Sequence, residues 1–204
     1  IIDGVPQNNQ KQFKQSLFDV EQIEVLKGPQ GSLFGRNAIG GAISITTKQP
    51  TNEFEGFVGG GISNGIGYRG EAGISGPIIE DKILFRAAAS YYETDGIIRN
   101  TFLNDDVDFV DHDVALRGKL TILPTDTLSI DLRASYNDVR AGSSYDTIVN
   151  NTANTPTVPL FRNGGANSVF SPTSDFRGFT DATIVDFSAK VDLELPFATA
   201  TYIL

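Results

Sequence analysis

Alternation of apolar and polar side chains with a period of two residues is the feature that most restricts the fold of this chain. After Asn52 it recurs in six or seven segments, and it is clearest over 185–195 and 128–137. In the first of these the apolar members are Val185, Phe187, Ala189, Val191, Leu193 and Leu195, and between them stand Asp186, Ser188, Lys190, Asp192 and Glu194. Successive side chains of a strand point to opposite faces, so each segment predicts a strand with one apolar and one polar face.

Two architectures fit such strands. A soluble antiparallel sheet places one face in a core and the other in water, whereas a transmembrane barrel places one face in lipid and the other in a polar lumen. The joins between strands favour the barrel, because 77–82, 124–127 and 196–199 are short and alternate with the longer 97–111 and 141–181. A structureless loop beyond about 12–15 residues is uncommon in a compact soluble domain. The short join at 64–67 is an exception to the alternation.

Composition excludes several classes of function. With 25 acidic and 16 basic residues, the net charge of −9 argues against a surface that binds nucleic acid. Cysteine is absent, so neither disulfides nor thiolate metal sites are expected, and we expect no cofactor. No apolar run reaches the ~20 residues of a transmembrane helix. The chain lacks Met and opens as if within a strand, which predicts an internal fragment of a longer protein.

Residues before position 50 follow a different pattern. The segment 16–22 predicts a short helix capped by Ser16 or Asp19. Strands are expected over 23–26 and 42–47, joined by a glycine-rich loop. We therefore expect residues 1–50 to form part of a globular domain distinct from the strands that follow.

The run IEVLKGPQGSLFGRNAIGGAISI at residues 23–45 resembles the C-terminal plug signature of TonB-dependent outer-membrane receptors. Shorter stretches that resemble the same family are 2–6, 19–21, 75–77 with 81–82, and 95–98. A phosphate-binding loop is excluded, because Gly41 stands where that motif requires Lys.

The resemblance implies a mainly β fold: part of an α+β plug domain over 1–50, then the first antiparallel strands of a transmembrane β-barrel over 51–204, an incomplete barrel. It implies ligand-gated import without catalysis in the Gram-negative outer membrane, in contact with lipid. The energy would come from the TonB complex, which binds an N-terminal region expected outside this chain. Ferric siderophores are the first ligands implied, and cobalamin, haem or oligosaccharides are alternatives. A passive barrel and a soluble β-sandwich binding module remain open.

Two groups of candidate site residues follow from the resemblance. Lys27 and Arg36 are expected to contact the barrel wall from the plug, although a solvated Lys and a loop donor to backbone carbonyls are the alternatives. An outward-facing plug apex that touches ligand is expected at Gln7, Asn8, Asn9, Gln10 and Lys11. An ordinary polar loop would explain the same residues.

The long join near 142–181 is predicted to act as a lid or a ligand contact, because long loops on rigid scaffolds tend to carry function. The expected ligand contacts within it are Phe161, Arg162, Phe170 and Arg177. A shield without a ligand role is the alternative.

Three further groups have simpler interpretations. The acidic cluster in 105–113 predicts a charged external loop, because it lacks the glycine and terminal Glu of a calcium loop. His112 has no Cys or His partner nearby in the sequence and is expected to be a solvated loop residue. Tyr91, Tyr92 and Tyr136 are candidates for an interfacial aromatic girdle.

Overall fold

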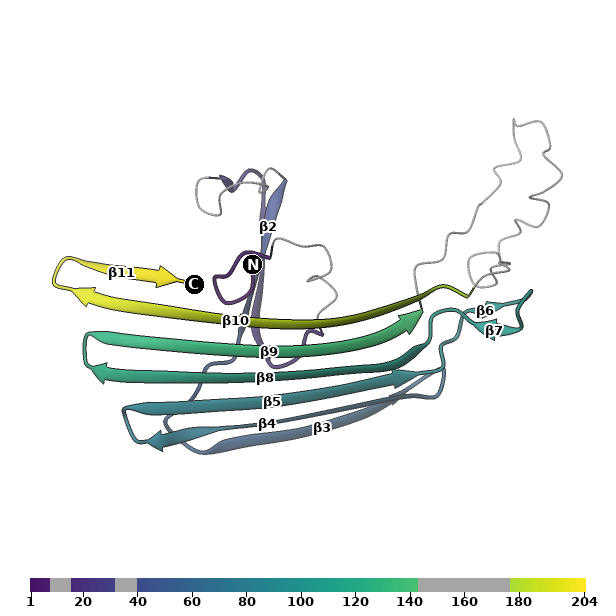
Figure 1. Cartoon of the computed structure of the whole chain (residues 1–204), viewed down its shortest axis with the longest axis horizontal. Coiled ribbons are helices and arrows are strands. Elements are labelled where there is room, and N and C mark those ends of the chain that lie inside the picture. The colour runs from purple at the N-terminus through teal and green to yellow at the C-terminus, as the bar shows by residue number, and fades with distance from the viewer. Residues whose placement is uncertain (8–15, 32–39, 143–176) are drawn as a thin grey trace.

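The computed structural model describes residues 1–7, 16–31, 40–142 and 177–204. Seven strands form one antiparallel sheet in the order β11-β10-β9-β8-β5-β4-β3, which we call the wall (Figure 1). Its strands are β3 (Glu55–Ser63), β4 (Gly67–Ile79), β5 (Ile83–Thr94), β8 (Val110–Thr125), β9 (Leu128–Gly142), β10 (Phe179–Leu195) and β11 (Ala198–Ile203). Among the described residues no helix is both long and apolar enough to cross a membrane.

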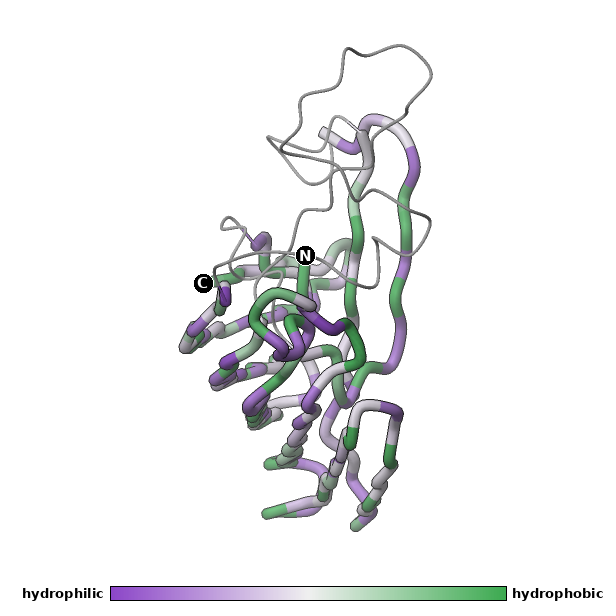
Figure 2. Tube along the Cα trace, turned by 90° about the vertical axis from the view of Figure 1, so that its right-hand side faces the viewer, coloured by the Kyte–Doolittle hydropathy of each residue, from purple (hydrophilic) through white to green (hydrophobic). Residues whose placement is uncertain are grey.

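The N-terminal segment, by which we mean the described residues up to Pro50, forms its own small sheet. Strands β1 (Val20–Lys27) and β2 (Gly41–Thr47) pair with each other, in antiparallel fashion, and not with the wall. Figure 2 shows the wall curving, with the N-terminal segment on its concave side. The paired wall strands are therefore arranged around one side of this segment.

The helix expected over 16–22 is wrong. Residues 16–18 have no regular structure, and β1 begins at Val20. Asp19 adopts the left-handed conformation, with φ +53°, which no right-handed helix accommodates. Its carboxylate instead pairs with Arg86 of β5, so a tertiary contact overrides the local capping pattern.

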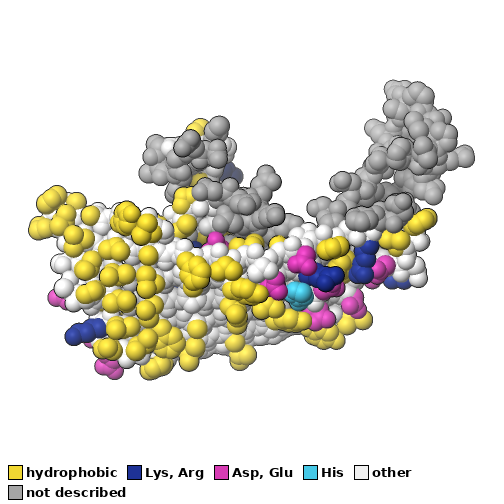
Figure 3. Space-filling model, in the orientation of Figure 1, with side chains coloured by type: hydrophobic (Ala, Val, Ile, Leu, Met, Phe, Trp, Pro, Cys, Tyr) yellow, Lys and Arg dark blue, Asp and Glu magenta, His cyan; other side chains and the backbone are white. Residues whose placement is uncertain are grey.

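The wall is inverted relative to a soluble sheet. On β8 the side chains of Arg117 and Lys119 are buried, at 7% and 9% exposure, whereas Leu116, which points to the opposite face, is 45% exposed. On β10 the exposure of Phe187 reaches 77%. Figure 3 shows apolar side chains spread over the outer surface of the wall. The polar face is covered by the N-terminal segment and the apolar face is bare, as the barrel interpretation predicts.

The joins between strands lie at two opposite ends of the wall. The turns β4–β5, β8–β9 and β10–β11 lie at one end of the wall, which we call the short-join end (Figure 1). The opposite end, the long-join end, carries β6 (Arg99–Asn100) and β7 (Asp105–Asp106), a small hairpin that replaces the irregular loop expected over 97–111. The 64–66 turn lies there too, since Asp95 donates a backbone hydrogen bond to Gly65.

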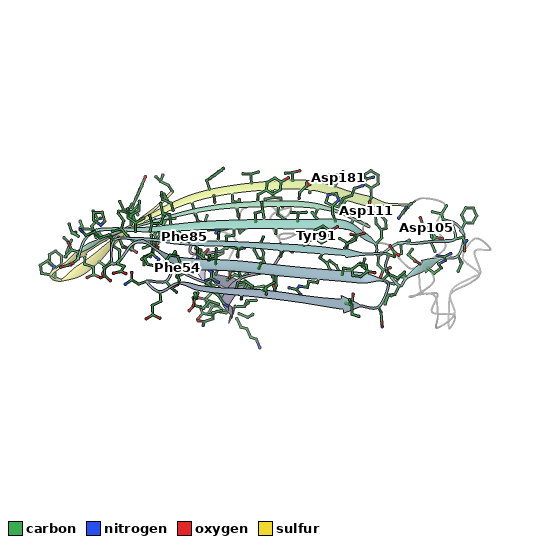
Figure 4. All side chains as sticks on the ribbon, turned by 90° about the horizontal axis from the view of Figure 1, so that it is seen from below. Phe54, Phe85, Tyr91, Asp105, Asp111 and Asp181 are labelled. Carbon is green, nitrogen blue, oxygen red and sulfur yellow. The ribbon has the colours of Figure 1, made fainter. Side chains whose placement is uncertain are left out.

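Side-chain chemistry changes along the strands. In Figure 4, Phe54 and Phe85 lie toward the short-join end, Tyr91 lies further along, and Asp111, Asp181 and Asp105 lie at the long-join end. The rings of Phe54 and Phe85 meet edge to face at 6.4 Å. Tyr91 and Tyr136 are exposed on the apolar face. Tyr92 faces the opposite side, because it follows Tyr91 in the same strand.

Candidate functional site

A row of polar side chains crosses the covered face of the wall. Residues that are direct register partners on neighbouring strands share one face. In strand order from β3 to β10 the row contains Glu55, Ser75, Arg86, Lys119, Arg133 and Ser188. Arg117 lies two residues from Lys119 on β8 and faces the same side. We call Arg86, Arg117, Lys119 and Arg133 the wall cations. Adjacent like charges repel, so this arrangement requires acceptors from elsewhere.

Asp19 supplies the first acceptor. Arg86 donates from Nε to Asp19 Oδ2 at 2.8 Å and from Nη2 to Asp19 Oδ1 at 2.5 Å. The two side chains are 4% and 1% exposed. A second carboxylate, Glu55, accepts from Nη1 of Arg86 at 3.1 Å. Paired contacts of this kind are among the stronger hydrogen bonds in proteins, so this pair fixes the start of β1 against β5.

Asp3 supplies the second acceptor. Its carboxylate lies 3.3 Å from Lys119 Nζ and 3.5 Å from Arg133 Nη1. Thr47, which is fully buried, donates to the same carboxylate from its backbone N at 2.8 Å and from Oγ1 at 2.7 Å. Lys119 in turn donates to the carbonyl oxygen of Thr47 at 3.1 Å. Asp3 therefore joins β8, β9 and the end of β2.

Backbone carbonyls complete the contact. Arg117 donates to the carbonyl of Phe18 at 2.7 Å, and its guanidinium lies 4.6 Å from the centre of the Phe18 ring. Arg133 donates to the carbonyl of Ile2 at 3.3 Å. The Phe18 ring is buried with Ala88 and Ala115 of the wall. A cation over an aromatic face gains further stabilisation when water is excluded.

The Thr47 hydroxyl offers a direct test of this contact. Replacing Thr47 with Val keeps the shape of the side chain but removes the hydroxyl that donates to Asp3 Oδ2, which then has only Lys119 and Arg133 beside it. We expect destabilisation of about 1–3 kcal/mol, measured by urea-dependent protease cleavage of the N-terminal segment. Thr183→Val is the control, because its hydroxyl donates to Asp138 at an exposed site. Equal effects of the two substitutions would contradict the role assigned to Thr47.

The link between the N-terminal segment and the wall is also fixed. Ser75 is fully buried and accepts hydrogen bonds from the backbone N and Oγ1 of Thr51, both at 2.9 Å, while donating to the Phe85 carbonyl. One residue later, Asn52 donates to Asp81 at 2.7 Å and accepts from the Asp81 backbone at 2.9 Å. The chain thus enters the wall from an anchored position at the short-join end.

The expected plug contacts and apex are described only in part. Lys27 is exposed, and it forms no ion pair with any residue in the described ranges. Gln7 donates to the Val5 carbonyl at 3.3 Å, and its buried Oε1 has no partner within the described part of the chain. Arg36, Asn8, Asn9, Gln10, Lys11, Phe161, Arg162 and Phe170 lie outside the described residues, as does most of the expected lid.

Arg177 lies at the long-join end. Its guanidinium is 3.0 Å from Asp105 and 4.0 Å from the centre of the Phe109 ring. Together with acidic side chains such as Asp95 and Asp106, it lines a cavity of about 310 Å³. The expected ligand contact therefore sits in a polar recess at this end of the wall.

The acidic cluster is divided between several roles. Asp108 accepts hydrogen bonds from the backbone N of Ile97 and Ile98, and Asp113 accepts from Ser16 at 3.0 Å. No group of three or more metal-ligating side chains occurs among the residues that the structure describes. His112 is in strand β8, not in a loop, and lies 3.4 Å from Asp138 across the β8–β9 pair. The longer wall strand, stabilised by pairing with β9, explains the difference.

The wall cations were not among the candidate site residues that the sequence suggested, and neither were Asp3 and Asp19 as their partners. The available signal was the placement of Arg and Lys at alternate positions of neighbouring strands. The partners lie far away in the sequence, so no spacing rule joins them.

Comparison with known proteins agrees with this geometry. The TonB-dependent receptor plug domain model matches residues 1–42. The pesticin receptor of Yersinia pestis is 40% identical over 94 residues, which cover 46% of this chain and 14% of that protein. The ferric-pyoverdine 358 receptor of Pseudomonas putida is 29% identical over 204 residues, covering 95% of this chain and 23% of that protein.

Solved structures share the fold. The ferric yersiniabactin uptake receptor of Yersinia pestis superposes with a TM-score of 0.77 at 24% identity, over 96% of this chain and 29% of that one. The ferripyoverdine receptor of Pseudomonas aeruginosa gives 0.70 at 20% identity, over 95% and 25%. This chain thus spans less than a third of the length of each of these relatives.

A curved wall that is apolar outside and polar inside, with a separate sheet held on its inner face, is the arrangement expected of part of a plugged β-barrel of the outer-membrane type. Residues 1–42 match the plug domain of TonB-dependent receptors, and the chain is similar to receptors of that family. The family consists of transport receptors.

Proposed function

We propose that the protein containing this chain imports a ferric siderophore across the outer membrane of a Gram-negative bacterium, driven by the TonB complex and without catalysis. The observation that carries this proposal is the buried contact of Asp3 and Asp19 with the wall cations. It supports the proposal that residues 1–50 belong to a plug and that residues 51–204 belong to the barrel wall on whose inner face the plug is seated. The relatives named for ferric pyoverdine and ferric yersiniabactin favour this ligand class over cobalamin, haem or oligosaccharides.

The chemistry of the contact suits a plug that must move. Removing one partner from a buried ion pair is strongly destabilising, so the docked position is well defined. The same groups are polar, and water can solvate them when the segment leaves the wall. An apolar contact would instead expose a surface that water solvates poorly. The contact can therefore be opened by external work and re-formed in the same register.

The apolar face of the wall supports a membrane location. On β10 the apolar positions run from Val185 to Leu195, which is about 33 Å along a strand at ~3.3 Å per residue. A strand tilt of about 40° reduces this to about 25 Å, the usual height of the lipid-facing band in outer-membrane barrels. At the long-join end the pairs His112–Asp138 and Arg140–Asp111 replace apolar contacts. We place this end in water outside the cell, where Arg177 would approach ligand.

Uptake of radiolabelled iron tests the proposal. The complete protein is expressed in a strain that lacks its own siderophore receptors, and ferric pyoverdine and ferric yersiniabactin are supplied separately. We expect uptake of at least one complex that requires both the receptor and TonB. Uptake that persists in a strain without TonB would identify a passive barrel, and failure with every siderophore tested would point to another ligand class.

A further inference from the structure

A cavity of about 630 Å³ lies between the N-terminal segment and the wall. Among its lining residues are Asp3, Lys119, Asp131, Arg133, Ser188 and Lys190. It therefore opens directly beside two of the wall cations and beside the carboxylate that neutralises them. Strand pairing does not account for this cavity. Neither the wall strands nor β1 and β2 need an empty volume here to form their hydrogen bonds.

The guanidinium of Arg133 has hydrogen-bond donors that its present partners do not use. The residue is 8% exposed, and its Nε and Nη2 atoms are buried without a hydrogen-bond partner among the described residues. The Nε atom of Arg117 is also buried and has no hydrogen-bond partner among the described residues. Buried donors that lack an acceptor cost free energy. If the contact served only to hold the plug, acceptors for these buried donors would make it more stable. The unpaired donors therefore point to a missing acceptor.

We propose that the wall cations are a binding site for the oxyanion groups of the imported ligand, which Asp3 and Asp19 mask until the N-terminal segment moves. The inference rests on the proposed function. Carboxylate oxygens of the ligand would take the places of the plug carboxylates, so the cations exchange one set of acceptors for another. The exchange avoids leaving several like charges unpaired on the inner face of the barrel.

The charge distribution supports such an exchange. The wall cations occupy two neighbouring rows of register partners, in which the wall's own carboxylates are Glu55 on β3 and Asp186 on β10, at the outer edges. When Asp3 and Asp19 withdraw, the centre of both rows is cationic. Arg86, Lys119 and Arg133 are successive register partners, and direct partners are about 4.5–5.5 Å apart. This spacing suits a compact ligand that carries several carboxylates.

Citrate is a suitable probe, because it carries several carboxylates in a small molecule. Its binding to the complete, purified receptor in detergent is measured by calorimetry at low salt. Asp3→Asn keeps the size of the side chain while removing the charge that masks Lys119 and Arg133. We expect this variant to bind citrate at least about tenfold more tightly than the unmodified receptor, and the affinity to fall as salt is added. Adding Arg133→Met to Asp3→Asn should abolish the gain.

Asp131→Asn is the matched control. It removes the same charge from the same cavity, but the Asp131 carboxylate accepts from Thr121 and forms no ion pair with Lys119 or Arg133. We expect no gain in citrate affinity. An equal gain in both variants would show a general charge effect and overturn the proposal, as would a gain that survives Arg133→Met.

A second variant covers the case in which Asp3→Asn does not fold. Ser188 is the register partner of Arg133 on β10, so Ser188→Asp places a carboxylate beside the unsatisfied guanidinium while the plug stays docked. We expect its melting temperature to exceed that of Ser188→Asn, and an equal or lower value would contradict an anion site. Neither measurement needs TonB or the natural ligand. Citrate binding without siderophore uptake would therefore refute the proposed function alone, and the reverse result would refute only this inference.

Discussion

Replacing Arg86 with Met is expected to weaken the docking of the N-terminal segment by about 3–5 kcal/mol, the usual cost of leaving one partner of a buried ion pair uncompensated. Met fills much of the space of the Arg stem but donates no hydrogen bond. The Asp19 carboxylate, whose side chain is 1% exposed, then remains buried without its two strongest donors. The measurement is the urea midpoint for protease cleavage of the N-terminal segment in the complete receptor.

Arg69→Met provides the control. Arg69 on the neighbouring strand β4 forms an ion pair with Glu71 at 3.8 Å, and the two side chains are 57% and 35% exposed. Exposed pairs contribute about 1 kcal/mol or less, so this midpoint should hardly change. A similar loss in both variants would mean that the burial of the Arg86–Asp19 pair has no special effect on docking.

A large effect is also expected on the opposite face of the wall. Leu132 on β9 is 39% exposed and faces away from the N-terminal segment. Replacing it with Arg should cost about 2–4 kcal/mol if it lies near the bilayer midplane, measured as the folding equilibrium of the complete receptor in lipid vesicles. Asp131→Asn, on the covered face, should change that equilibrium by less than about 1 kcal/mol. Equal tolerance at the two positions would rule out lipid contact of the apolar face.

The wall strands were largely predictable because their side-chain pattern reports their environment directly. The alternation over 185–195 and 128–137 corresponds to β10 and β9, and the short joins predicted the turns at one end. Periodicity alone left open which face is covered. Exposure decided that question, because Phe187 is bare and Arg117 is buried.

The contact between the N-terminal segment and the wall was much less predictable. Asp3 and Asp19 both have positive φ values, +48° and +53°, and both carboxylates form ion pairs with the wall. Neither turn has a sequence signature that names its cationic partner. Local rules assigned Asp19 to a helix cap, whereas its pairing with Arg86 depends on how the residues just before β1 lie against β5. Contacts of this kind follow from the assembled fold and not from any single segment.

The anchored link at Thr51 and Asn52 limits how far the plug can travel. A chain spans at most about 3.6 Å per residue, so the four steps from Thr51 back to Thr47 allow the end of β2 to lie at most roughly 14 Å from Thr51 while the Thr51–Ser75 hydrogen bonds last. Motion of the N-terminal segment is then a swing on a short tether fixed at β4. The segment separates least from β4 and β5 and most from β9 and β10. A passage formed in this way would run along the side of the barrel that carries Arg133 and Ser188.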